Sequence, residues 1–148
     1  MSGMTPVEVV LQFVDAINAK DLPGIAALMT KDHRFVDSLG AVVVGGEKMR
    51  GAWEVYFRMV PDYLVEIRET YCCGQVVVLL GAARGTYTSD GSLRPENVWE
   101  TPGAWRVLAR GDRVAEWWVY ADNEPIRRMM AAHSAQQTDP ADRPSAGR

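Results

Sequence analysis

Asp37 is the residue of this sequence best placed to do chemistry. It follows the apolar pair Phe35 and Val36 and precedes a turn-forming segment at residues 38–40. A carboxylate that an apolar segment delivers into a desolvated pocket is a better proton acceptor than one in water, which suits a general base. The alternative is structural, because Asp in a loop commonly accepts hydrogen bonds from the backbone of its own turn. From these residues alone, both roles of Asp37 remain open.

Few other side chains have the spacing that metal or nucleophile chemistry needs. The histidines, His33 and His133, are far apart in the sequence and have no ligand-type neighbour at metal-binding spacing. His33, beside Asp32, is expected to be a solvated loop residue. Cys72 and Cys73 are adjacent, which fits disulfide geometry poorly, so reduced thiols are expected. Nucleotide-binding and serine-hydrolase glycine motifs are absent from the sequence. We therefore expect no metal and no organic cofactor.

Length and composition predict an ordinary globular protein. The chain has 148 residues, of which 47% are hydrophobic and 24% charged, and this favours a single domain. A net charge of −3 gives no basic surface for nucleic acid. No apolar segment approaches the roughly 18 residues that a membrane span requires, and the N-terminus does not have the pattern of a secretory signal. These features predict a cytoplasmic protein.

Three segments in the first half have helical periodicity. The first starts after Thr5, which can cap it, and carries apolar residues on more than one face as far as Ile17. A short second helix follows Asp21, and a third runs from about Glu47 to Val60, before a proline. A helix that is apolar on more than one face must be covered on more than one side. The first helix is therefore expected to lie inside the fold or to border a cavity.

The second half changes to the alternating period of β-strands. Strands are predicted at 63–73, 76–88, 96–109 and 113–122, joined by tight hairpins, with an interruption at Pro102 and Gly103. The glycines of the second of these strands, Gly81 and Gly85, suit a bulge or a bend. A short helix should end at Met130. The sequence thus predicts an α+β domain over residues 1–133 and a disordered tail over residues 134–148, which hold no core-forming residues.

Two segments carry a family resemblance: "VVLQFVDAINAKDLPGIAALMTKDHRFVDSLG" at 9–40 and "GDRVAEWWVYADNEPI" at 111–126. In these strings and in its order of elements the chain resembles the NTF2-like superfamily, in the SnoaL-like and ketosteroid-isomerase-like branch, over roughly residues 5–130. The resemblance implies a cone, in which a curved antiparallel sheet wraps around the N-terminal helices and leaves a ligand pocket at its mouth. It also implies a homodimer through the outer sheet face. The last strand agrees, since Trp117 and Val119 share one face and Trp118 and Tyr120 the other, so both faces need cover.

The resemblance also places the candidate site. Asp37 falls on the position of the general base of ketosteroid isomerases. The positions of that enzyme's two oxyanion donors hold Phe13 and Gly103, whose side chains cannot donate a hydrogen bond, so a true steroid isomerase is not expected. The aspartate that limonene epoxide hydrolase carries on its last strand is replaced by Val119, and Arg84 lacks the acid that would complete that mechanism.

An apolar cone with one carboxylate on its wall is the resulting prediction. Tyr87 would be the only nearby hydroxyl. The candidate ligand-binding residues are Phe13, Met29, Trp53, Phe57, Tyr87, Trp99, Trp105 and Trp117. Two functions follow: a cofactor-independent isomerase, cyclase or lyase that acts on a small hydrophobic molecule with Asp37 as general base, or a non-catalytic ligand-binding or dimerisation module.

Overall fold

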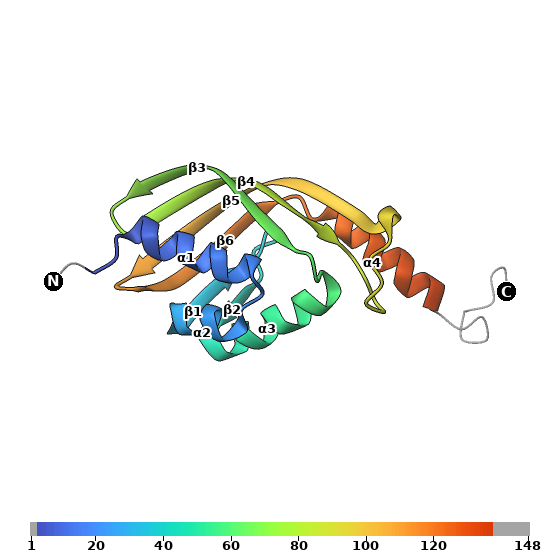
Figure 1. The fold of residues 1–148 in the computed structure, drawn as a ribbon, viewed down its shortest axis with the longest axis horizontal. Helices are drawn as coiled ribbons and strands as arrows, with labels where there is room; N and C mark the ends of the chain where they lie inside the picture. Colours follow the sequence, from blue (N-terminus) through green and yellow to red (C-terminus); the bar gives the residue numbers. More distant parts are fainter. Residues whose placement is uncertain (1–2, 138–148) are drawn as a thin grey trace.

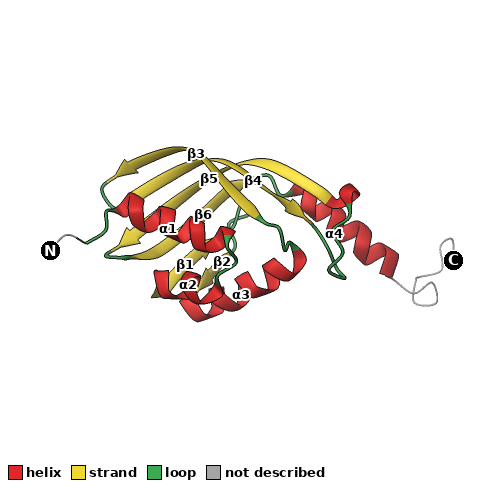
Figure 2. Ribbon diagram, in the orientation of Figure 1, coloured by secondary structure: helices red, strands yellow, loops and turns green. Residues whose placement is uncertain are grey.

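The computed structural model describes residues 3–137 as a curved sheet with helices against one face (Figures 1 and 2). The helices are α1 (Pro6–Asn18), α2 (Leu22–Leu28), α3 (Gly46–Met59) and α4 (Glu124–Gln137). The strands are β1 (Met29–Val36), β2 (Val42–Val44), β3 (Leu64–Cys73), β4 (Val76–Thr86), β5 (Val98–Arg110) and β6 (Arg113–Ala121), with a 3₁₀ turn at Pro95–Asn97.

The strands form one six-stranded sheet in the order β2-β1-β6-β5-β4-β3. All neighbouring pairs are antiparallel except β1 and β6, which run parallel, so the sheet is mixed. Helix α1 crosses the concave face, and α2 and α3 lie beneath β1 (Figure 1). This is the predicted α+β cone, but the sheet, which was expected to be antiparallel, is mixed because β1 and β6 pair in parallel.

Helix α1 forms the centre of the core. Thr5 caps it by accepting a hydrogen bond from the backbone N–H of Glu8 at 3.2 Å, and Pro6 occupies the first turn, where its missing N–H has no partner to lose. Apolar residues on more than one face of this helix are buried, as predicted, although Leu11 is 37% exposed. The buried residues are Val9, Val10, Phe13, Val14 and Ile17.

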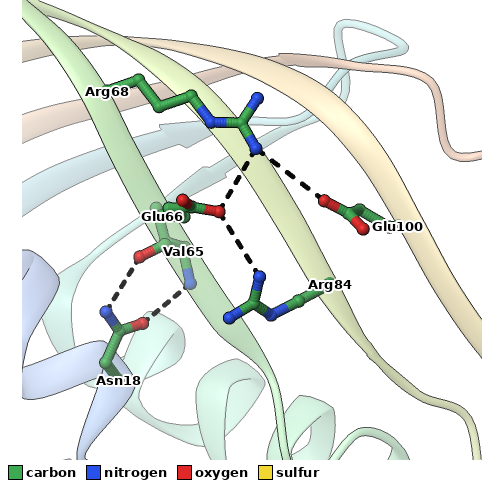
Figure 3. Close-up of polar contacts among 6 residues, drawn as sticks. All are labelled: Asn18, Val65, Glu66, Arg68, Arg84 and Glu100. Atoms are coloured by element: carbon green, nitrogen blue, oxygen red, sulfur yellow. Dashed lines mark hydrogen bonds and ion pairs between the residues drawn. The ribbon is translucent and has the colours of Figure 1, made fainter.

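Asn18, the last residue of α1, attaches this helix to the edge strand β3. Its side-chain amide donates to the Val65 carbonyl at 2.9 Å, and the Val65 N–H donates to the Asn18 Oδ1 atom at 2.8 Å (Figure 3). Lys20, which has a positive φ, donates to the carbonyl of Tyr63 nearby. The side-chain amide thus satisfies backbone groups that an edge strand would otherwise leave unpaired.

The pairing of β1 with β6 explains one wrong prediction. His33 lies within β1 rather than in a loop and is completely buried. Its Nδ1 atom is 2.8 Å from the carbonyl of Val114, and its ring lies against Phe13. The local sequence around His33 is polar, so only the parallel partner strand reveals that this residue faces the core.

Strand β5 is continuous through Pro102, where an interruption was predicted. Strand β6 ends at Ala121, opposite Gly103, so no residue of β6 lies beside Pro102. The missing N–H of this proline therefore costs no hydrogen bond to β6. The bulge lies in β3, between Ile67 and Glu69, and Gly81 is paired with Ile67 beside it. A Cβ atom on Gly81 would lie 1.8 Å from the Glu66 carbonyl oxygen, so only glycine allows this close approach.

Helix α4 extends beyond its predicted end at Met130 and reaches Gln137. Residues 138–148 of the predicted tail lie outside the described residues. Among residues 3–137, no helix is long and apolar enough to cross a lipid bilayer.

Candidate functional site

A pocket of about 290 Å³ lies between the Asp37 turn, helix α3 and strand β6. Its wall is mainly apolar and aromatic, and its polar side chains come from several elements. The lining residues are Phe35, Asp37, Ser38, Val43, Met49, Ala52, Trp53, Tyr56, Tyr63, Trp117, Val119 and Asn123. We refer to it as the mouth pocket.

Asp37 lines the mouth pocket and also holds its own turn together. Its Oδ1 atom accepts hydrogen bonds from the backbone N–H groups of Leu39 and Ala41, each at 2.9 Å. Gly40 has a φ of +87°, which lets the chain reverse tightly after the carboxylate. Among the described residues, no group donates a hydrogen bond to Oδ2. One oxygen of Asp37 is therefore structural and the other is available to a ligand.

Asn123 ties the segment after β6 to the Asp37 turn. Its side-chain amide donates to the Ser38 hydroxyl oxygen at 2.7 Å, and both residues line the mouth pocket. The Ser38 hydroxyl accepts this bond, so its own proton remains free to be donated. No pattern in the sequence indicates this contact, because the two residues are 85 positions apart.

Trp53 is the centre of the aromatic wall. It is 6% exposed and stacks on Phe57 with ring centroids 5.5 Å apart, while Phe35 meets it edge-on at 6.4 Å. On the opposite side of the pocket, Trp117 packs against Phe13 at 5.3 Å. These contacts fix the rings, so the apolar wall is formed before any ligand binds.

Two tyrosines contribute to the wall of the same pocket. The rings of Tyr56 and Tyr63 meet edge-on at 5.0 Å, and both residues line it. Burial raises the pKa of both phenols above the usual range, and the neighbouring Tyr56 adds to the rise for Tyr63, so both stay protonated. Neither hydroxyl bonds to another of the described residues, which leaves two potential donors. Tyr56 shares the helical stripe of Trp53, which is the only signal of its position in the sequence.

The residues that were predicted to line one pocket are distributed over the molecule. Asp37, Trp53 and Trp117 line the mouth pocket. Phe13, Trp99 and Trp105 lie in the core, and Phe57 stacks on Trp53 without lining the pocket. Met29 borders a separate groove, and Tyr87 a separate cavity beside His133. The expectation that Tyr87 is the only nearby hydroxyl is therefore wrong, since Tyr56 and Tyr63 have that position.

The structure explains the positions at which this chain differs from ketosteroid isomerases and limonene epoxide hydrolase. A Cβ atom on Gly103 would lie 2.7 Å from the Trp105 ring, so an aspartate there would require this indole to move. Val119 does line the mouth pocket, but its side chain has no polar group. Arg84 is exposed and pairs with Glu66 (Figure 3). Among residues 3–137, no three His, Cys, Asp or Glu side chains gather into a possible metal site.

Solved structures that resemble this one share the NTF2-like fold. A hypothetical protein with a ketosteroid isomerase-like fold from Catenulispora acidiphila, solved with trimethylamine, is 21% identical, with a TM-score of 0.70 over 95% of this chain and 100% of that chain. IdmH from Streptomyces antibioticus, whose assignment as a polyketide cyclase is provisional, is 19% identical, with a TM-score of 0.71 over 86% of this chain and 99% of that chain.

A third structure comes from a protein without a known role. This NTF2-like protein from Cytophaga hutchinsonii is 15% identical, with a TM-score of 0.65 over 85% of this chain and 97% of that chain. The comparison with curated proteins gave no significant match. The family model of the SnoaL-like domain matches residues 10–117, which include most of α1, the Asp37 turn, α3 and Trp117. Because this match spans most of the chain and the fold agrees with it, the protein belongs to the SnoaL-like domain family.

Proposed function

We propose that the mouth pocket binds a small hydrophobic molecule that carries a carbonyl oxygen. The observation that carries the proposal is one pocket in which a carboxylate and two neutral phenols meet an apolar aromatic wall. At about 30 Å³ per water-sized group, 290 Å³ accommodates roughly ten non-hydrogen atoms. A ligand of one or two rings matches this volume.

The same residues support a cofactor-independent proton transfer. Asp37 Oδ2 would take a proton from the carbon next to the carbonyl group, and the electron pair of that C–H bond would move onto the carbonyl oxygen. The hydroxyls of Tyr56 and Tyr63 would donate hydrogen bonds to this oxygen as it becomes negative. Asp37 would then return the proton to another carbon, which completes an isomerisation or prepares a ring closure. A positioned general base typically contributes about 10²- to 10⁴-fold to the rate.

A non-catalytic ligand-binding module is the second candidate. The hydrogen bonds from Leu39 and Ala41 to Asp37 Oδ1 favour it, because they give the carboxylate a structural task whether or not a reaction occurs. Both candidates use the mouth pocket and differ only in whether Oδ2 accepts a proton.

Exchange of the α-protons of 1-indanone in D₂O, followed by NMR, separates the two candidates. In Asp37→Asn the amide oxygen can still accept the turn hydrogen bonds, so the fold should be kept. Catalysis predicts accelerated exchange by the unaltered protein and a loss of about 100-fold or more in the variant. Binding of 1-indanone without accelerated exchange would support the module. Equal acceleration by both proteins would contradict the role of Asp37.

We further infer that a second copy of the chain covers the outer sheet face. Neighbouring strands place Leu80, Ala104 and Tyr120 in one row of this face, and Tyr120 is 55% exposed. Beside this apolar row, Arg68 lies between Glu66 and Glu100 (Figure 3). Side chains of both signs suit a symmetric interface, in which each copy presents the same surface to the other.

A further inference from the structure

A groove separate from the mouth pocket is rich in positive charge. It has a volume of about 550 Å³ and lies where the beginnings of β1 and β6 meet helix α3. Three cations from these three elements border it: Lys31, Arg50 and Arg113. None of its residues lines the mouth pocket. We call it the cationic groove.

The three cations form no ion pair with any other residue of the described range 3–137. Arg50 shows this most clearly, because Glu54 stands four residues further along α3, at a spacing that favours a pair. Glu54 instead bonds Arg58 at 2.7 Å, which leaves the guanidinium of Arg50 free. The groove therefore has three cations and two acids, Glu47 and Glu54, and one of these acids is already neutralised by Arg58. This surface is positive on a chain whose net charge is −3.

The remaining wall provides space for an uncharged part of a ligand. Ala26, Met29 and Gly51 border the groove, and a Cβ atom on Gly51 would meet no atom within 4 Å. Small and apolar residues therefore lie next to the charged ones. Such a surface can hold an organic group while the cations hold its anionic end.

We propose that the cationic groove binds a small molecule that carries a phosphate group. A phosphate presents three or more oxygen acceptors in different directions, which matches three cations from three elements better than a carboxylate with two oxygens does. The guanidinium groups of Arg50 and Arg113 would donate to the phosphate oxygens, and Lys31 would add a third positive charge. The site is independent of the mouth pocket and of any reaction there.

Calorimetric titration of the full chain with pyrophosphate tests this proposal. Saturable binding is expected, with weaker binding at higher salt, and Arg50→Gln or Arg113→Gln should each weaken it about tenfold. Arg34→Gln is the matched control, since Arg34 is an exposed arginine of β1 outside the groove. Glu47→Gln should bind more tightly, because it removes a negative charge from the groove. Circular dichroism of each variant checks that the exposed substitutions leave the fold unchanged.

Three results would overturn the proposal. These are the absence of saturable binding, equal affinity in Arg50→Gln, Arg113→Gln and Arg34→Gln, or acetate binding as tightly as pyrophosphate. Tighter binding by Glu47→Gln would show that the changes in affinity do not come from damage to the fold, because such damage could not increase affinity.

Discussion

Asp37 has a structural task in its own turn and lies at the wall of the mouth pocket. Its Oδ1 atom accepts hydrogen bonds from the N–H groups of Leu39 and Ala41, whereas its Oδ2 atom accepts none from the described residues. The sequence also pointed to Trp53 and Trp117, which do line the mouth pocket. It did not single out Tyr56 and Tyr63, because periodicity shows that a side chain faces inward but not whether it meets packed core or open space.

His33 should make the stability of the protein depend on pH. Burial is the main cause that lowers the pKa of this imidazole below 6.5, and the nearby carboxylates of Asp32 and Glu116 and the Val114 carbonyl only partly oppose it. Its Nε2 atom is buried without a partner, so a proton added there would have no acceptor among the described residues. Below pH 6.5 the unfolded chain binds this proton more readily than the folded one, so stability falls as the pH decreases from there.

Urea unfolding between pH 5 and pH 8 measures this effect. The free energy of unfolding should decrease below about pH 6.5, by up to about 1.4 kcal/mol for each pH unit until the folded-state pKa is reached. His33→Gln should remove most of this slope even if it lowers stability throughout, whereas His133→Gln should keep it. An unchanged slope in His33→Gln would show that other groups cause the dependence.

Among the helices and strands, the sequence predicted the elements with strong apolar periodicity. It did not predict the bounds of elements that depend on a neighbouring strand. Helix α1 and the hairpin strands follow from their apolar patterns. Strand β1 begins earlier than its sequence suggests because β6 pairs with it, and β5 passes through Pro102 because β6 has already ended there. Helix α4 continues beyond Met130, where its weak apolar pattern gave no indication of where it ends.

Asn18 provides a test of how α1 is attached to the sheet. Asn18→Ala removes both hydrogen bonds to Val65 and should lower the free energy of unfolding by about 1–3 kcal/mol, since the backbone of an edge strand loses its partner. Amide hydrogen exchange at Val65 should become faster as well. Gln12→Ala, an exposed change on the same helix, should alter stability by less than about 0.5 kcal/mol. Equal stability of Asn18→Ala and the unaltered protein would contradict this account.

At the scale of the whole molecule, the two faces of the sheet have different tasks. The concave face holds the core and the mouth pocket, and the outer face carries an apolar row that a second copy would cover. Tyr120→Lys should convert a dimer into a monomer, because two copies of a new charge would be buried close together. Sedimentation measures the mass, and Val55→Lys, at a similarly exposed position on α3, is the control. A monomeric unaltered protein or a dimeric Tyr120→Lys would contradict the proposed interface.

The most direct test of the central claim is calorimetric binding of 1-indanone to a protein whose mouth pocket has been filled. Ala52 is exposed and lines the pocket, so Ala52→Trp should occupy its space without removing any polar group. We expect saturable binding to the unaltered protein and to Ala131→Trp, an exposed change on α4, and loss of binding in Ala52→Trp. Equal binding by Ala52→Trp, or no binding by the unaltered protein, would contradict the assignment of the mouth pocket as the ligand site.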